Sequence, residues 1–136
     1  MDKLESSFWS LMRSHIPARA DVQRIETGST GRGIPDVNVC LEGNERWWEL
    51  KIVKGRKVDL TPEQISWHFR RTRAGGVTWI VARDKVDGVR KGKYDKIYAW
   101  LGGEAIDVKR SGILHPTPYI WGAPFKWVEI MDVLLK

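Results

Sequence analysis

The chain has 136 residues, which is enough for one compact domain with one hydrophobic core. Lys and Arg number 23 against 17 Asp and Glu, and the formal charge of +6 is typical of a domain that binds nucleic acid. A single cysteine, Cys40, excludes a disulfide framework and a thiolate metal cluster, and the sequence holds neither a membrane-spanning apolar run nor a recognisable signal peptide. We therefore expect a cytoplasmic protein with a single domain over residues 1–136.

The first predicted elements are a helix and a strand. Apolar residues recur with a period of 3.6 over residues 2–15, which predicts an amphipathic helix that ends before Pro17. Glu5 lies beside the apolar stripe of this helix and has, with Asp2, the spacing of a capping box. Residues 21–26 then predict a strand.

A glycine-rich loop follows this strand at residues 28–33. Glycines permit close backbone approach and unusual dihedral angles. The loop's amides and its polar side chains suit a phosphate group, and a plain connector is the alternative; the polar residues are Ser29, Thr30 and Arg32. Because the loop leads directly to Asp36, we favour the phosphate interpretation.

Two alternating stretches, residues 34–41 and 46–53, predict a β-hairpin with its turn at residues 43–44. Side chains on a strand alternate between the two faces of the sheet. One face of the hairpin is wholly apolar and is expected to face the core; its residues are Val37, Val39, Leu41, Trp48, Leu50 and Ile52.

The other face of the hairpin gathers charged residues. Either a two-residue turn at residues 43–44 or a four-residue turn over residues 42–45 places Asp36 opposite Lys51 and Asn38 opposite Glu49, so Asp36, Glu49 and Lys51 converge. Two carboxylates are suitable ligands for Mg²⁺, and a neighbouring lysine can orient an attacking water or offset charge in a phosphoryl transition state. The alternative is an ordinary cross-strand ion pair on a solvated face.

A basic loop and a helix follow the hairpin. Residues 54–59 form the loop, and its three cations suit a DNA backbone, with a solvated loop as the alternative; they are Lys54, Arg56 and Lys57. Thr61 and Gln64 predict a capped helix that extends to about Arg73. We expect an inward face formed by Ile65, Phe69 and Thr72, and a basic exposed face formed by His68, Arg70, Arg71 and Arg73.

The remaining elements begin with a strand at residues 77–82 that is apolar enough to be buried on both faces. Beyond it the sequence predicts a charged loop, a second β-hairpin that turns at Gly102-Gly103, an irregular proline-containing segment and a short helix. These lie at residues 83–93, 95–101 with 104–109, 111–125, and 127–135.

Pro35-Asp36 followed by Glu49-Leu50-Lys51 resembles the motif of the PD-(D/E)XK nuclease superfamily. The wider sequence resembles the virus-type replication-repair nuclease branch (VRR-Nuc) and the phage and archaeal Holliday-junction resolvases, through Gly33-Ile34-Pro35-Asp36, Leu60-Thr61-Pro62-Glu63-Gln64 and Gly75-Gly76-Val77. The resemblance covers residues 1–83 and leans towards a phage protein. It implies an α/β, restriction-endonuclease-like α-β-β-β-α-β core with a mixed central sheet, to which residues 84–136 add a C-terminal elaboration.

The resemblance also implies an activity and its residues. The chain would be a Mg²⁺-dependent endonuclease that hydrolyses phosphodiester bonds in branched DNA, such as a Holliday junction, as a homodimer; Mn²⁺ is expected to substitute. The implied metal ligands are Asp36, Glu49, the Leu50 carbonyl and Glu5, and the implied catalytic residues are Asp36, Glu49, Lys51 and Gln64. The expected DNA contacts are Ser29, Thr30, Arg32, Lys54, Arg56, Lys57, Arg70 and Arg71.

Other functions also fit parts of the sequence. A restriction-like, nicking or general repair nuclease would use the same residues. A basic DNA-binding module without activity predicts a broken triad, whereas Asp36, Glu49 and Lys51 are all present. An interaction protein could use some of the eight tryptophans, but it leaves the alignment of the triad unexplained.

Overall fold

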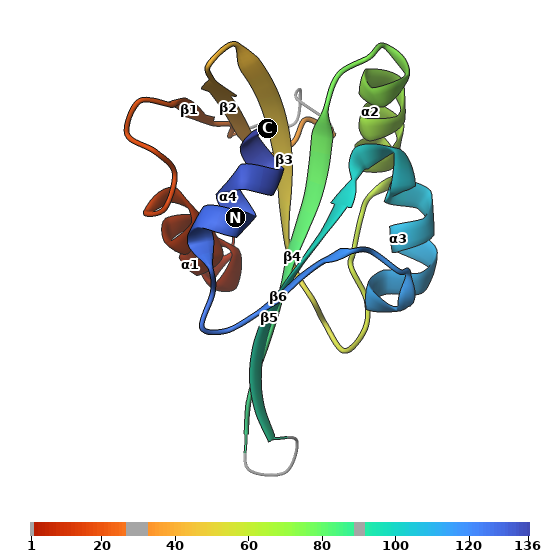
Figure 1. The fold of residues 1–136 in the computed structure, drawn as a ribbon. Coiled ribbons are helices and arrows are strands. Elements are labelled where there is room, and N and C mark those ends of the chain that lie inside the picture. The colour runs from red at the N-terminus through yellow and green to blue at the C-terminus, as the bar shows by residue number, and fades with distance from the viewer. Residues whose placement is uncertain (1, 27–32, 89–91) are drawn as a thin grey trace.

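The computed structural model describes residues 2–26, 33–88 and 92–136 (Figure 1). In chain order their elements are α1 (Lys3–Arg13), β1 (Asp21–Arg24), β2 (Val37–Leu41), β3 (Asn44–Ile52), α2 (Pro62–Arg73), β4 (Thr78–Gly88), β5 (Gly92–Leu101), η1 (Gly102–Glu104), α3 (Ala105–Ser111), η2 (Gly112–Leu114), β6 (Tyr119–Gly122) and α4 (Trp127–Leu135). The predicted core order α-β-β-β-α-β is therefore confirmed. None of the helices in these ranges is long and apolar enough to cross a membrane.

The six strands form one sheet in the order β1-β2-β3-β4-β5-β6. The β3–β4 pair is parallel and the other pairs are antiparallel, so the sheet is mixed as predicted. The parallel pair needs a crossover connection, and α2 supplies it. Helices α1 and α4 cover one face of the sheet and α2 and α3 cover the other (Figure 1). The α/β class expected from the sequence is thus confirmed.

The first core cluster lies between the sheet and the α1–α4 layer. Phe8, Met12 and Trp48 are fully buried in it, and burial of each such side chain contributes about 2–3 kcal/mol. Trp48 also donates its indole N–H to the Leu134 carbonyl at 3.1 Å, which ties β3 to α4. The apolar hairpin face predicted from the sequence belongs to this cluster, with Val37, Val39, Leu41 and Leu50 buried and Ile52 partly buried.

The second core cluster lies on the opposite face, under α2 and α3, and includes Leu60, Ile80, Trp100 and Val108. Because neighbouring strand residues point to opposite faces, Glu49 and Lys51 lie on this second face when Trp48 and Leu50 lie on the first. The charged face of the hairpin is therefore the face that α2 covers.

The predicted register of the hairpin is wrong by two residues. The structure pairs Val37 with Trp48 and Leu41 with Asn44, so neither proposed pair, Asp36 with Lys51 or Asn38 with Glu49, is formed. The turn lies at Glu42-Gly43, and both residues have positive φ, as a two-residue type I′ turn requires. A shift of two residues keeps every side chain on its predicted face, so the division into a charged and an apolar face is correct.

The predicted faces of α2 are correct only in part. Ile65 packs inward and the three arginines at 70, 71 and 73 are exposed as predicted, but Phe69 and Thr72 are exposed and His68 is buried. Trp67 and His68 are buried, with 8% and 0% exposure, whereas Phe69 is 60% exposed. The sheet provides partners for the buried pair, because Trp67 packs edge-on against Trp47 and the His68 ring bonds to Thr78. These partners are distant in sequence, so the apolar period of the helix alone did not reveal them.

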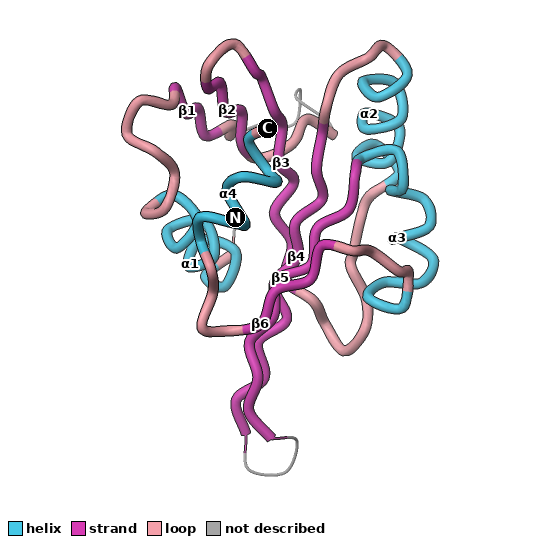
Figure 2. Tube along the Cα trace, viewed as in Figure 1, coloured by secondary structure: helices cyan, strands magenta, loops and turns pink. Residues whose placement is uncertain are grey.

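The C-terminal third differs from the prediction in three places. The charged stretch at 83–93 largely continues β4 and begins β5, so these strands extend well past the central sheet as a hairpin (Figure 2). Residues 105–111 form α3, because Ala105 and Val108 are buried at helical spacing. The segment predicted as irregular contains β6, which pairs with β5. The predicted helix at 127–135 is confirmed as α4.

Candidate active site

Asp36 lies at the point where β2 and β3 part. The ladder between these strands begins at Val37 and Trp48, and β3 continues for four residues beyond that pair. The Leu50 amide donates to Asp36 Oδ2 at 2.8 Å, so the carboxylate accepts a bond from an amide of this continuing part of β3. The Asp36 carbonyl accepts from the Ile25 amide at 2.7 Å, which fixes the backbone behind the side chain.

Gly33 brings the segment before Asp36 onto the start of α2. Its φ is +80°, and a Cβ at this position would lie 2.3 Å from the Glu63 carbonyl oxygen, so only glycine fits. The same turn of α2 is held by the predicted capping box: Thr61 Oγ1 accepts from the Gln64 amide at 3.2 Å, and Gln64 Oε1 accepts from the Thr61 amide at 2.9 Å. Gln64 thus lies at the edge of the site, and its side-chain carbonyl oxygen is already hydrogen-bonded to the Thr61 amide.

Glu49 is the most buried carboxyl group of the site, with 2% of its surface exposed. Burial and the neighbouring Asp36 carboxylate raise the pKa of Glu49 well above its usual range. The Asp36 carboxylate is thus close enough to Glu49 to disfavour a negative charge on it. Glu49 Oε1 is buried and has no hydrogen-bond partner within the described part of the chain.

Lys51 and Glu5 complete the charged cluster predicted from the sequence. Lys51 is half-buried and lies on the same sheet face as Glu49. Burial raises the pKa of Glu5, the Asp2 and Asp36 carboxylates raise it further, and Lys51 lowers it, so Glu5 lies within the electrostatic reach of the site. Asp2 caps α1 by accepting from the Glu5 amide at 2.9 Å, which leaves the Glu5 side chain available.

The donor set fits a hard divalent cation. Among residues 2–26, 33–88 and 92–136, no group of three His, Cys, Asp or Glu side chains comes together as a ready metal cage. Mg²⁺ does not need such a cage, because it keeps several waters and binds through one or two carboxylates. Asp36 and Glu49 supply two adjacent carboxyl groups, and the Glu49 oxygen that lacks a partner in the described ranges is the kind of atom that a cation would satisfy.

The basic loop lies directly beyond Lys51 at the end of β3. Lys54 and Lys57 pair through two backbone hydrogen bonds of 3.0 Å, and the side chains of Lys54, Arg56 and Lys57 are exposed. The Arg56 carbonyl accepts from the Ile113 amide at 3.0 Å, which anchors the loop to η2. The three cations are therefore presented from an anchored turn next to the site.

The remaining predicted DNA contacts divide into two groups. Arg70 and Arg71 are exposed on α2, but the Arg71 guanidinium lies over the rings of Trp67 and Trp47 at 4.7 and 5.6 Å. Ser29, Thr30 and Arg32 lie outside the described residues.

Two residues near the site were missed by the sequence reasoning. Arg24 on β1 donates to the Asp36 carbonyl at 3.1 Å and lies 4.0 Å from its Oδ1. His68 is buried under α2, and burial, with a smaller effect of Lys51, lowers its pKa to about 4. Of these two residues, only Arg24 could have been found from the sequence. It lies on the predicted strand just before the glycine-rich loop that leads to Asp36, which places it near the site.

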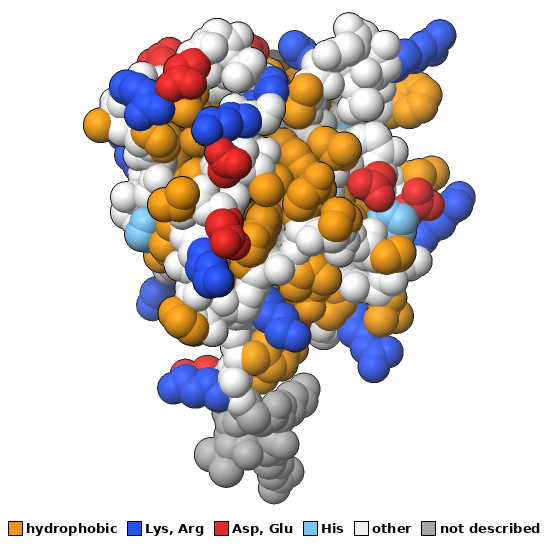
Figure 3. All heavy atoms as spheres, viewed as in Figure 1, with side chains coloured by type: hydrophobic (Ala, Val, Ile, Leu, Met, Phe, Trp, Pro, Cys, Tyr) orange, Lys and Arg blue, Asp and Glu red, His pale blue; other side chains and the backbone are white. Residues whose placement is uncertain are grey.

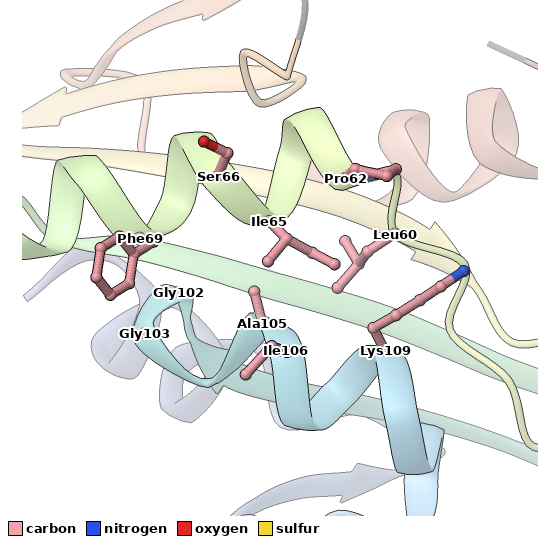
Figure 4. A pocket seen from close by; sticks show the side chains of 10 residues that line it. All are labelled: Leu60, Pro62, Ile65, Ser66, Phe69, Gly102, Gly103, Ala105, Ile106 and Lys109. Atoms are coloured by element: carbon pink, nitrogen blue, oxygen red, sulfur yellow. The ribbon is translucent and has the colours of Figure 1, made fainter.

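An apolar groove of about 580 Å³ lies between α2 and α3, away from the carboxyl pair (Figure 4). Its lining includes Leu60, Ile65, Phe69, Ala105, Ile106 and Lys109. Among the described residues its lining is apolar apart from Ser66 and Lys109, and it includes no carboxylate.

Comparison with known proteins found one weak structural similarity and no sequence match. No family model matches the chain, and no curated protein sequence is similar to it. Among solved structures, it is similar to Hjc, a Holliday junction resolvase from the archaeal hyperthermophile Archaeoglobus fulgidus. The match has a TM-score of 0.43 and 12% sequence identity, and it covers 69% of this chain and 72% of the other. This similarity is too weak to identify a function.

Proposed function

We propose that the chain is a metal-dependent DNA endonuclease. The observation that carries the proposal is the Asp36–Glu49 carboxyl pair where β2 and β3 part, with Lys51 on the same face. One buried oxygen of Glu49 has no hydrogen-bond partner among the residues that the structure describes. Burial of two carboxyl groups side by side is costly for stability, and a structural role would be better served by apolar side chains. A cation bound by both carboxyl groups would offset this cost, because it neutralises their charge.

Each residue of the site has a proposed role. Asp36 and Glu49 would hold Mg²⁺, with the Leu50 carbonyl as a further ligand and Glu5 close enough to bind through a water. When bound, the metal would lower the pKa of a water and polarise the scissile phosphate. Lys51 would orient the attacking water or offset the negative charge that develops on the phosphate. Gln64, whose carbonyl oxygen caps α2, would keep the helix end in place beside the site.

The substrate we propose is branched DNA. The chain has a formal charge of +6, and the anchored loop at residues 54–57 presents three cations beside the carboxyl pair. A two-fold homodimer would present two sites to a two-fold junction, which is the symmetry that paired cleavage requires. A restriction-like or nicking nuclease would use the same chemistry on unbranched duplex.

The test is cleavage of a panel of DNAs by the full chain, with Mg²⁺ and with a chelator. The panel contains a four-way junction, a flap, a nicked duplex, a linear duplex and a single strand. We expect chelator-sensitive cleavage that is highest on the junction. Preferred cleavage of unbranched duplex would replace the resolvase assignment by the restriction-like one, and the absence of Mg²⁺-dependent cleavage of every DNA would overturn the proposal.

Substitutions then locate the site. Asp36→Asn and Glu49→Gln should lower cleavage by at least about 100-fold, and Lys51→Ala should do the same with little loss of DNA binding. Glu45→Gln is the matched control, because Glu45 is an exposed carboxylate of the same strand. A readout besides activity is thermal stabilisation by Mg²⁺ alone, which we expect for the wild type and the control but not for Asp36→Asn. Wild-type cleavage by Asp36→Asn or Glu49→Gln would move the site elsewhere.

A further inference from the structure

Strands β4 and β5 continue past the rest of the sheet as a two-stranded ribbon. The pairing of β3 with β4 ends at Ile52 and Arg83, and the pairing of β6 with β5 reaches only Lys96. From here Asp84–Gly88 pairs with Gly92–Lys96, of which only Lys96 also pairs with β6, and Figures 1 and 2 show this hairpin projecting from the body. We call residues 84–88 and 92–96 the ribbon. Five residues of β-strand correspond to about 15 Å of projection.

The base of the ribbon is clamped to the body. The Arg83 guanidinium donates to both carboxylate oxygens of Asp95 at 3.0 and 2.7 Å, with both side chains largely buried. The Asp95 carbonyl accepts from the Ala123 amide at 2.9 Å, and the Tyr94 hydroxyl donates to Asp84 at 3.1 Å. An isolated two-stranded hairpin is only marginally stable in water, so these bonds hold the ribbon in one direction.

The ribbon begins next to the candidate active site. Lys51 pairs with Ala82, two residues before Asp84 along β4. Because strand residues alternate, Asp84 lies on the same face as Ala82 and Lys51, and its cross-strand partner Lys96 shares that face. Tyr94 lies on this face as well, with the Lys96 ammonium 5.7 Å from its ring. One face of the ribbon therefore continues the face of the sheet that holds the carboxyl pair.

The side chains of the ribbon are mostly charged rather than apolar. Of its lysines, Lys93 pairs with Asp87 at 3.8 Å, whereas Lys85 and Lys96 form no ion pair within the described residues. Acidic and basic side chains are visible on the projecting part in Figure 3. Arms that exchange between two copies of a chain bury apolar side chains at their contact. The described residues of the ribbon include only two such side chains, Val86 and Tyr94, so the ribbon is better suited to a polar partner than to a second copy.

We propose that the ribbon lies in a groove of the duplex that flanks the cleaved bond. The major groove of B-DNA is about 12 Å wide and admits a two-stranded ribbon, and about 15 Å of ribbon corresponds to about five base pairs. Lys96 lies on the face that continues from the site and Lys85 on the other face, and each contacts phosphates on a wall of the groove. The ribbon then sets how much duplex must lie on one side of the scissile phosphate. This inference rests on the proposed nuclease function, because that function supplies the DNA.

The experiment measures binding of four-way junctions to the full chain with a chelator present, so that cleavage does not occur. The variants are Lys85→Gln, Lys96→Gln and the double substitution, which change exposed side chains and leave the clamp intact. Lys126→Gln is the matched control, because Lys126 is an exposed lysine at the start of α4, on the opposite layer of the molecule. Each ribbon substitution should reduce the log–log salt dependence of binding by about 0.9, and the control should leave it unchanged.

A series of junction arm lengths gives a second readout. Shortening the arms by about five base pairs should weaken binding of the wild type and the control, and should have a smaller effect on the double variant. If wild-type protein binds and cleaves junctions while the double variant keeps its salt dependence and its arm-length dependence, the ribbon is not on DNA and the inference is wrong. If instead the double variant changes the oligomeric mass of the free protein without changing its DNA binding, the ribbon contacts a second copy. Failure of the wild type to bind any DNA would overturn the nuclease proposal itself.

Discussion

His68 is the buried group whose titration the structure predicts most directly. Its side chain has no exposed surface, its Nδ1 lies 2.8 Å from Thr78 Oγ1, and its Nε2 is buried without a partner among the described residues. A protonated imidazole needs acceptors for both N–H groups, and the described residues around this ring offer only the Thr78 hydroxyl. The folded protein therefore favours neutral His68.

The size of the effect follows from the pKa of His68. Burial, with a smaller contribution from Lys51, lowers this pKa from 6.5 to about 4. Because one pKa unit corresponds to about 1.4 kcal/mol, the difference amounts to about 3 kcal/mol of unfolding free energy. Between pH 6.5 and 4 the unfolded chain binds a proton that the folded chain does not. The stabilisation is therefore complete above pH 6.5 and is lost as the pH falls towards 4.

The assay is urea denaturation of the wild type and His68→Asn at several pH values from 7.5 to 4, with a chelator present. Asparagine can keep a hydrogen bond to Thr78 but does not titrate. The smaller side chain lowers stability by an amount that does not depend on pH. We expect the difference in unfolding free energy between the two proteins to change by about 3 kcal/mol across this range, with the wild type losing more on acidification.

Taking a difference at each pH removes the contribution of the other titrating groups, which both proteins share. His115→Asn is the control for loss of a more accessible histidine, since His115 lies near the surface and bonds to Glu104 at 2.9 Å. A difference curve for His68→Asn that stays flat from pH 7.5 to 4 would refute the reasoning, because it would mean that His68 is solvated or paired in its charged form.

Two further predictions concern the site itself. Because the pKa of Glu49 is raised in the folded state, its contribution to stability is complete below its unfolded pKa and is lost as the pH rises through the folded one. In the presence of a chelator, Glu49→Gln should therefore gain stability relative to the wild type from pH 5 to pH 8 in urea denaturation, and a constant difference would contradict the burial of this carboxyl. Gly33→Ala should cost at least about 2 kcal/mol more than Gly43→Ala, because both glycines have φ near +80° but only the Gly33 Cβ would meet the Glu63 carbonyl. Equal losses of unfolding free energy would show that the close approach to α2 is absent.

The faces of the hairpin were predictable because they depend only on local geometry. Side chains on a strand alternate, so any register that keeps Trp48 in the core places Glu49 and Lys51 on the opposite face with Asp36. The register itself depended on which two residues form the turn. Glu42 takes a positive φ there, an uncommon conformation for a residue other than glycine, and composition gave no sign of it.

Local sequence also determined the start of α2 and the end of the chain. Thr61, Pro62 and Gln64 form the capping box that their spacing predicts, and the apolar period at residues 127–135 forms α4. The stretch at 104–109 was misread because Gly102-Gly103 has the composition of a hairpin turn. In the fold, Gly102 instead lies so close to Thr78 and His68 that a side chain would not fit, and a helix follows it.

The sequence by itself determined that Asp36, Glu49 and Lys51 share one face of a β-hairpin, because alternation along a strand is a property of the backbone. Only the tertiary structure decided that this face lies beneath α2, where Glu49 has almost no exposed surface and the neighbouring Asp36 carboxylate raises its pKa. Burial depends on elements far apart in the chain, such as Gly33 against Glu63 and His68 against Thr78. The identity of the charged residues is therefore a local property, whereas their protonation is set by the packing around them.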